Sequence, residues 1–125
     1  MADDEINILT LSGEALKQQG YDIITASNGL MAMEKAISEK PDLIILDRQM
    51  PGMSGLEVCK KIRETTELRN VPVIFLTGQD TKAEIMEGYS EGANEYITKP
   101  FNLNELIETV ANILSKPESS GLDTI

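Results

Sequence analysis

The fold of this chain is decided by one stretch of sequence, Lys40-Pro41-Asp42-Leu43-Ile44-Ile45-Leu46-Asp47-Arg48-Gln49-Met50-Pro51-Gly52-Met53-Ser54-Gly55-Leu56-Glu57. Its residues 42–47 form an apolar run that ends in a carboxylate, which is typical of a strand in a parallel sheet covered on both faces. A loop with Pro51 and two glycines follows. A serine with a glutamate three residues later then makes a capping box, so we expect a helix over residues 54–65.

Strand and helix patterns alternate on both sides of this stretch, which favours a parallel sheet with helices on both faces. The spacing of apolar residues, the capping residues and the glycine and proline breaks predict the remaining elements. Helices are expected over residues 6–19, 30–39 and 102–115 and from residue 81 to about residues 88–92, and strands over residues 21–26, 71–76 and 95–98. We expect a single α/β domain over residues 1–115 and a frayed, polar tail over residues 116–125.

Composition restricts the class of protein. The chain has 125 residues, 41% of them apolar, and a net charge of −10, so a polyanion such as DNA would be repelled. Its N-terminus does not resemble a signal peptide, and no apolar run approaches the roughly 18 residues that a membrane helix needs. The single cysteine, Cys59, excludes an internal disulfide and fits a reducing compartment, so we expect a cytoplasmic protein. The chain has no histidine, which excludes every site that depends on an imidazole within the chain.

Chemical groups recur where the predicted strands end. Asp47, Thr77 and Lys99 each follow a strand, and Asp3 and Asp4 directly precede the first helix. Each could be only a helix cap or a turn residue, but their convergence on one edge of a sheet weakens that interpretation. Two carboxylates about 4 Å apart repel by roughly 4 kcal/mol at an effective dielectric constant near 20. Such a cluster would favour Mg²⁺, an oxygen-seeking cation that commonly bridges carboxylates to a phosphoryl group.

Four segments, in this order and spacing, resemble the signatures of response-regulator receiver domains. They are residues 3–5, the stretch quoted above, residues 73–77 and residues 99–101. The similarity extends from residue 2 to about residue 115. It implies a flavodoxin-like, doubly wound parallel sheet with strand order 2-1-3-4-5.

The resemblance also implies roles for individual residues. Asp47 would be the phosphoacceptor, taking a phosphoryl group from the phosphohistidine of a sensor histidine kinase or phosphotransfer protein in a Mg²⁺-dependent reaction. The implied Mg²⁺ ligands are Asp3, Asp4, Asp47 and the main-chain carbonyl of Gln49. Thr77 and Lys99 would contact the phosphoryl group, Tyr96 matches the switch aromatic of the family, and the Lys99-Pro100 peptide bond would be cis.

This function makes the chain a regulatory phosphoacceptor of a two-component system rather than an enzyme, although it would assist its own phosphorylation and dephosphorylation. The new charge would switch the binding of an output protein, without direct binding to nucleic acid or membrane. We expect the output surface around residues 83–114. Three alternatives compete. A pseudo-receiver would keep the fold as an unphosphorylated interaction platform. A phosphatase with an aspartyl nucleophile would need an acid at Gln49, and a flavin or dinucleotide carrier would need a glycine-rich phosphate loop.

The sequence departs from the family at its start, where only Met1 and Ala2 precede the acidic residues, so the first strand is expected to be missing or truncated. About four buried apolar residues, at roughly 1.5–3 kcal/mol each, would contribute a large part of the stability of a domain. We expect upstream residues in the functional protein. A strand from another copy or from the C-terminal tail is the alternative.

Overall fold

The computed structural model describes residues 1–48, 50, 52–78 and 92–115. Four α-helices are assigned there: α1 (Ile6–Gln18), α2 (Gly29–Glu39), α3 (Gly55–Glu64) and α5 (Leu103–Ser115). The assigned strands are β1 (Ile44–Asp47), β2 (Val73–Thr77) and β3 (Glu95–Thr98), and a short 3-10 helix, η1 (Thr66–Leu68), precedes β2. The helix expected to begin at residue 81 and the tail expected over residues 116–125 lie outside the described residues.

The sheet is parallel. Strands β1, β2 and β3 lie in that order, with Asp47 opposite Leu76 and Thr77 opposite Thr98. On the other edge of β1, Ala2 forms bridges to both Leu46 and Ala26. The first residues of the chain therefore lie between β1 and the segment that ends at Ala26. The resulting order of segments along the sheet is 2-1-3-4-5, so the predicted fold class is confirmed.

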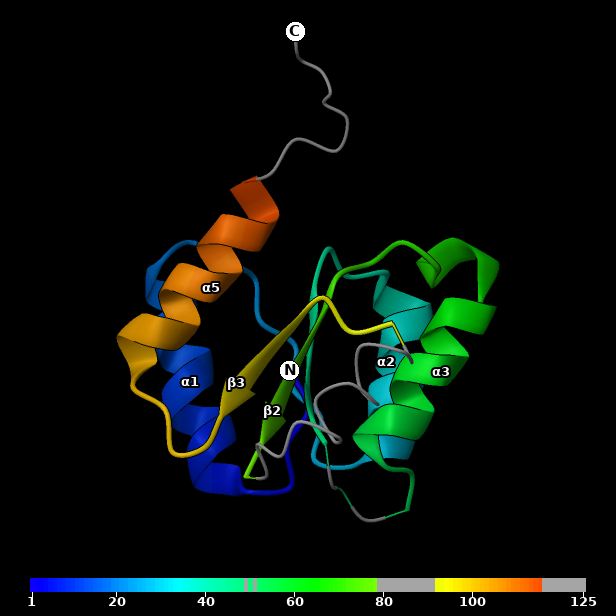
Figure 1. Cartoon of the computed structure of the whole chain (residues 1–125), viewed down its shortest axis with the longest axis horizontal. Coiled ribbons are helices and arrows are strands. Elements are labelled where there is room, and N and C mark those ends of the chain that lie inside the picture. The colour runs from blue at the N-terminus through cyan, green and yellow to red at the C-terminus, as the bar shows by residue number, and fades with distance from the viewer. Residues whose placement is uncertain (49, 51, 79–91, 116–125) are drawn as a thin grey trace, which may run out of the picture.

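Helices cover both faces of this sheet, with α1 and α5 on one side and α2 and α3 on the other (Figure 1). Each face buries its own apolar cluster. Phe75 and Leu46 belong to the cluster that includes residues of α2 and α3, whereas Ile74 and Ile45 belong to the cluster that includes residues of α1 and α5. This alternation of side chains explains why β1 and β2 are apolar at successive positions. Within the described residues, every helix is too short or too polar to cross a membrane.

Local structure follows the capping residues. The predicted capping box is present, since Glu57 N donates to Ser54 Oγ and Ser54 N donates to Glu57 Oε1, each over 3.2 Å. Asn28 is the N-cap of α2, and its side chain accepts a hydrogen bond from Met31 N over 2.9 Å. Its β-region backbone and its side-chain oxygen suit the start of a helix as well as a turn.

The strand expected over residues 21–26 forms a ladder contact only at Ala26. A ladder requires a neighbouring strand of similar length. The neighbour here is the segment of residues 1–3, whose contacts end at the amino group of Met1, which donates to Ile24 O over 2.8 Å. The prediction was wrong in length because it rested on the local pattern of residues 21–26 alone, whereas a ladder depends on the partner segment.

Candidate functional site

An acidic cluster lies at the carboxyl end of β1. Asp3, Asp4 and Asp47 can each offer one carboxylate oxygen, and these oxygens lie within 4.8 Å of one another. Asp47 ends β1, whereas Asp3 and Asp4 follow the residue that pairs with β1, so the sheet register itself brings the three together. Asp47 is 6% exposed and Asp3 is fully buried, whereas Asp4 is exposed. The cluster therefore combines two desolvated carboxylates with one that reaches solvent.

The two carboxylate oxygens of Asp3 have different surroundings. Asp3 Oδ1 accepts a hydrogen bond from Glu5 N over 2.9 Å, a local turn that leads into α1. Asp3 Oδ2 is buried, lies 2.9 Å from Lys99 Nζ and accepts no well-oriented hydrogen bond. Desolvating a carboxylate without such bonds is costly. This oxygen is suited to an additional cationic ligand.

Lys99 brings a positive charge to the acidic cluster. Its Nζ lies 2.9 Å from Asp3 Oδ2, 2.9 Å from Glu5 Oε1 and 3.4 Å from Asp47 Oδ2. Burial alone would lower the pKa of Lys99, but the close carboxylates of Asp3 and Glu5 and the charge of Asp47 raise it well above its ordinary value. Lys99 is therefore a fixed positive charge at neutral pH, and it offsets part of the repulsion within the cluster.

Thr77 and Tyr96 lie on the two strands that continue the sheet. Thr77 ends β2 and is 3% exposed, and its carbonyl accepts a hydrogen bond from Lys99 N over 2.7 Å, which ties the two strand ends together. Tyr96, on β3, is half-buried, and its ring lies 5.4 Å from that of Phe75 between centroids. The Lys99-Pro100 peptide bond is cis. Gln49, whose carbonyl was expected to bind the metal, lies outside the described residues.

The start of α3 lies close to the end of β1. Gly55 N donates to Arg48 O over 2.9 Å, and a Cβ at Gly55 would collide with the backbone of Asp47 and Arg48. Only glycine fits this close approach of α3 to the end of β1. The role of this glycine was not predicted from the sequence, although its place directly after the serine of the capping box was an available signal.

Two charged residues near the site were not assigned a role by sequence analysis. Glu5 pairs with Lys99, although the two are 94 positions apart. Arg48, directly after Asp47, is a buried arginine. The signals were present, since Glu5 extends the acidic run and Arg48 is adjacent to the acceptor candidate. Only the tertiary structure shows that Glu5 pairs with Lys99 and that Arg48 is buried.

The chain is similar in sequence and in fold to known proteins. The sequence model of the response regulator receiver domain family matches residues 1–111. The chain is 42% identical over 118 residues to the alkaline phosphatase synthesis transcriptional regulatory protein PhoP of Bacillus subtilis, covering 94% of this chain and 48% of that protein. The chain thus spans about half the length of this curated relative.

Two solved structures have the same fold as this chain. The chemotaxis protein CheY4 of Vibrio cholerae matches with a TM-score of 0.86 and 33% identity, over 90% of this chain and 93% of that one. The receiver domain of the sensor histidine kinase PA1611 of Pseudomonas aeruginosa, which has a magnesium ion coordinated in its active site cleft, matches with a TM-score of 0.84 and 25% identity, over 92% and 94%. This chain belongs to the response regulator receiver domain family.

Proposed function

We propose that Asp47 is the phosphoacceptor of this receiver domain. A carboxylate oxygen of Asp47 attacks the phosphorus of a phosphohistidine on a kinase or phosphotransfer protein. The new O–P bond gives an aspartyl phosphate, the P–N bond breaks, and the histidine imidazole leaves as the donor protein takes up a proton. The observation that carries the proposal is the position of Asp47 at the end of β1, buried between two further carboxylates and Lys99.

The residues present fit a bound Mg²⁺. Three carboxylates supply hard oxygen ligands, and the buried Asp3 Oδ2 lacks a well-oriented hydrogen bond. We propose that Asp3, Asp4 and Asp47 hold the ion, with the main-chain carbonyl of Gln49 as a further ligand. When bound, Mg²⁺ neutralises the negative charge that develops on the phosphoryl oxygens. The magnesium ion in the PA1611 receiver domain, a relative of the same fold, supports this choice of metal.

Lys99 and Thr77 are proposed to receive the phosphoryl oxygens. Lys99 Nζ already lies 3.4 Å from Asp47 Oδ2, and its pairing with Glu5 is at the surface, where an ion pair contributes little. A phosphoryl group on Asp47 would add about −1.5 to −2 charge and give Lys99 a stronger partner. Thr77, at the end of the next strand, would offer its hydroxyl, and Tyr96 would adjust its packing in response.

The readout is proposed to be a change in protein contacts. The donor is a sensor histidine kinase or phosphotransfer protein, and the output surface includes β3 and α5, together with residues that lie outside the described ranges. The net charge of −10 disfavours direct binding to nucleic acid. In this setting the chain acts in the cytoplasm as a regulator, and it assists its own phosphorylation and dephosphorylation.

Incubation with acetyl phosphate and Mg²⁺, followed by intact-protein mass spectrometry, tests the proposal. The wild-type chain should gain one phosphoryl group, and Asp47→Asn should gain none. Asp4→Asn should slow the gain because the metal site loses a ligand. Asp42→Asn is the matched control, since Asp42 is an exposed carboxylate just before the same strand, and it should react like the wild type. Labelling of Asp47→Asn would move the acceptor elsewhere. An unlabelled wild type would favour the pseudo-receiver interpretation.

A further inference from the structure

The ammonium group of Lys99 does not treat its three neighbouring carboxylates alike. Among the described residues, the one hydrogen bond that Lys99 Nζ donates goes to Glu5 Oε1, over 2.9 Å. Its approaches to Asp3 Oδ2, at 2.9 Å, and to Asp47 Oδ2, at 3.4 Å, are ion pairs without a well-oriented hydrogen bond. The ammonium group is therefore oriented toward Glu5 rather than toward the proposed acceptor.

Glu5 stands at the start of α1 but does not serve that helix with its side chain. It is the N-cap of α1 and makes no side-chain capping bond. The shorter side chains of Ser, Thr, Asp and Asn are the usual N-caps, because they reach the amides of the first turn. The backbone of Glu5 is fixed on both sides, since its N–H donates to Asp3 Oδ1 over 2.9 Å and its carbonyl accepts from Leu9 N over 3.1 Å. The side chain is thus held within reach of Lys99.

Lys99 lies at the border between the buried and the exposed part of the site. Its backbone is fixed, because Lys99 N donates to Thr77 O over 2.7 Å. Its side chain is 14% exposed, compared with 59% for Glu5 and 0% for Asp3. Rotation about the side-chain bonds of Lys99 can therefore move its hydrogen bond between an outer partner and an inner one.

The contact with Glu5 is weak enough to be exchanged. An exposed ion pair changes an equilibrium constant by about fivefold at most. A phosphoryl group on Asp47 would carry a charge of about −1.5 to −2. It would also lie in the more buried part of the site, where solvent screens charges less. Lys99 would therefore leave Glu5 for the phosphoryl oxygens.

We propose that Glu5 is a positioning residue that holds Lys99 while Asp47 is unmodified and releases it when Asp47 is phosphorylated. This inference rests on the proposed function of Asp47. The exchange moves a charge contact from the start of α1 to the end of β1. Because the contact with Glu5 must break, Glu5 lowers the affinity of the site for a phosphoryl group.

Carbodiimide cross-linking tests the contact directly. The reagent activates an exposed carboxylate such as that of Glu5, and a lysine in contact with it then forms an amide bond. The carboxylate oxygen leaves with the reagent, which becomes a urea. Mass spectrometry of the digested chain should detect the amide between Glu5 and Lys99. Beryllofluoride with saturating Mg²⁺ mimics a phosphoryl group on Asp47 and should reduce this product at least threefold.

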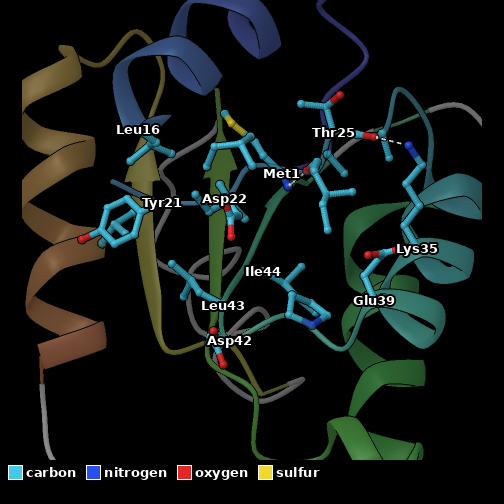
Figure 2. A pocket seen from close by; sticks show the side chains of 18 of the residues that line it. Met1, Leu16, Tyr21, Asp22, Thr25, Lys35, Glu39, Asp42, Leu43 and Ile44 are labelled. Carbon is cyan, nitrogen blue, oxygen red and sulfur yellow. Dashed lines mark hydrogen bonds between the residues drawn. The ribbon is translucent and has the colours of Figure 1, made fainter. Parts of the chain in front are cut away.

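Two other lysines supply references for this experiment. Lys40 Nζ lies 3.3 Å from Glu67 Oε2, and both side chains are 64% exposed. Lys35 Nζ donates to Thr25 O over 2.9 Å (Figure 2), and a backbone carbonyl cannot be cross-linked by carbodiimide. Neither contact involves the acidic cluster. The cross-link between Lys40 and Glu67 should therefore form equally with and without beryllofluoride.

Calorimetric titration with beryllofluoride in saturating Mg²⁺ measures how strongly Glu5 competes for Lys99. Glu5→Gln keeps the length of the side chain and removes its charge, so it should bind about three- to fivefold more tightly than the wild type. Glu5→Asp keeps the charge but is one methylene group shorter. It should also bind at least about twofold more tightly, because its carboxylate does not reach Lys99. Glu14→Gln removes an exposed acid about two and a half turns further along α1 and should leave the Kd unchanged.

The outcomes separate this inference from the function on which it rests. A Kd for Glu5→Gln equal to or higher than that of the wild type would overturn the inference. So would a Glu5→Asp chain that binds like the wild type, because charge alone would then act, and so would a cross-link between Glu5 and Lys99 that is absent or that beryllofluoride leaves undiminished. A wild-type chain that binds no beryllofluoride would instead overturn the proposed function of Asp47, and this inference with it.

Discussion

Lys99 offsets the repulsion among the carboxylates of the site. Replacing it measures how much this contributes to the free energy of unfolding. Lys99→Met should lower the free energy of unfolding in EDTA by about 3 kcal/mol, because it removes the partner of the fully buried Asp3 carboxylate. Urea denaturation measures this change. Saturating Mg²⁺ should restore part of the loss, since the metal would supply the missing positive charge.

Lys17→Met is the matched control, because Lys17 is an exposed lysine on α1. Its free energy of unfolding should stay within about 0.5 kcal/mol of the wild type. An equal loss in both variants would show that Lys99 stabilises through general charge balance rather than through Asp3.

The amino group of Met1 makes stability depend on pH in a predictable direction. Burial, with a smaller contribution from the charge of Lys35, lowers its pKa from 8.0 to about 6. Between these values the unfolded chain binds more protons than the folded chain, so the free energy of unfolding should rise with pH from about 6 to about 8. A shift of two pKa units corresponds to about 2–3 kcal/mol.

Acetylation of the Met1 nitrogen isolates this contribution, because the acetylated group does not titrate. The difference in unfolding free energy between acetylated and free protein should be largest near pH 6 and should shrink toward pH 8. A difference that stays constant across this range would mean that the amino group is not buried in the folded state.

At the scale of elements, the turn between β1 and α3 depends on Gly55. Gly55→Ala should lower the free energy of unfolding by about 1–3 kcal/mol, because the added methyl group would displace the backbone of Asp47 and Arg48. Urea denaturation measures the loss. Gly78→Ala is the comparison, since no atom lies within 4 Å of a Cβ there, and it should change stability by less than about 1 kcal/mol.

The elements around the site could be predicted because each has a local signal. Capping residues fixed the start of α3, and the apolar run before Asp47 defined the last residue of β1. The extent of residues 21–26 as a strand could not be predicted, because pairing depends on a partner elsewhere in the chain. That Asp3 is buried while Asp4 is exposed could not be predicted either. This difference follows from the register of Ala2 against Leu46, which no local sequence pattern encodes.

At the scale of the whole molecule, a net charge of −10 means that any salt should stabilise the fold by screening, so a specific effect of Mg²⁺ must be separated from ionic strength. We expect the midpoint of thermal unfolding to be several degrees higher in Mg²⁺ than in NaCl of equal ionic strength, because a ligand at about 100 times its Kd stabilises the folded state by about 2.7 kcal/mol.

Asp4→Asn should lose most of this additional stabilisation by Mg²⁺, whereas Glu108→Gln, which removes an exposed acid on α5, should keep it. Differential scanning calorimetry distinguishes the two. If both variants lose the excess equally, Mg²⁺ acts on the overall charge of the molecule, and the three carboxylates at the end of the sheet are not its binding site.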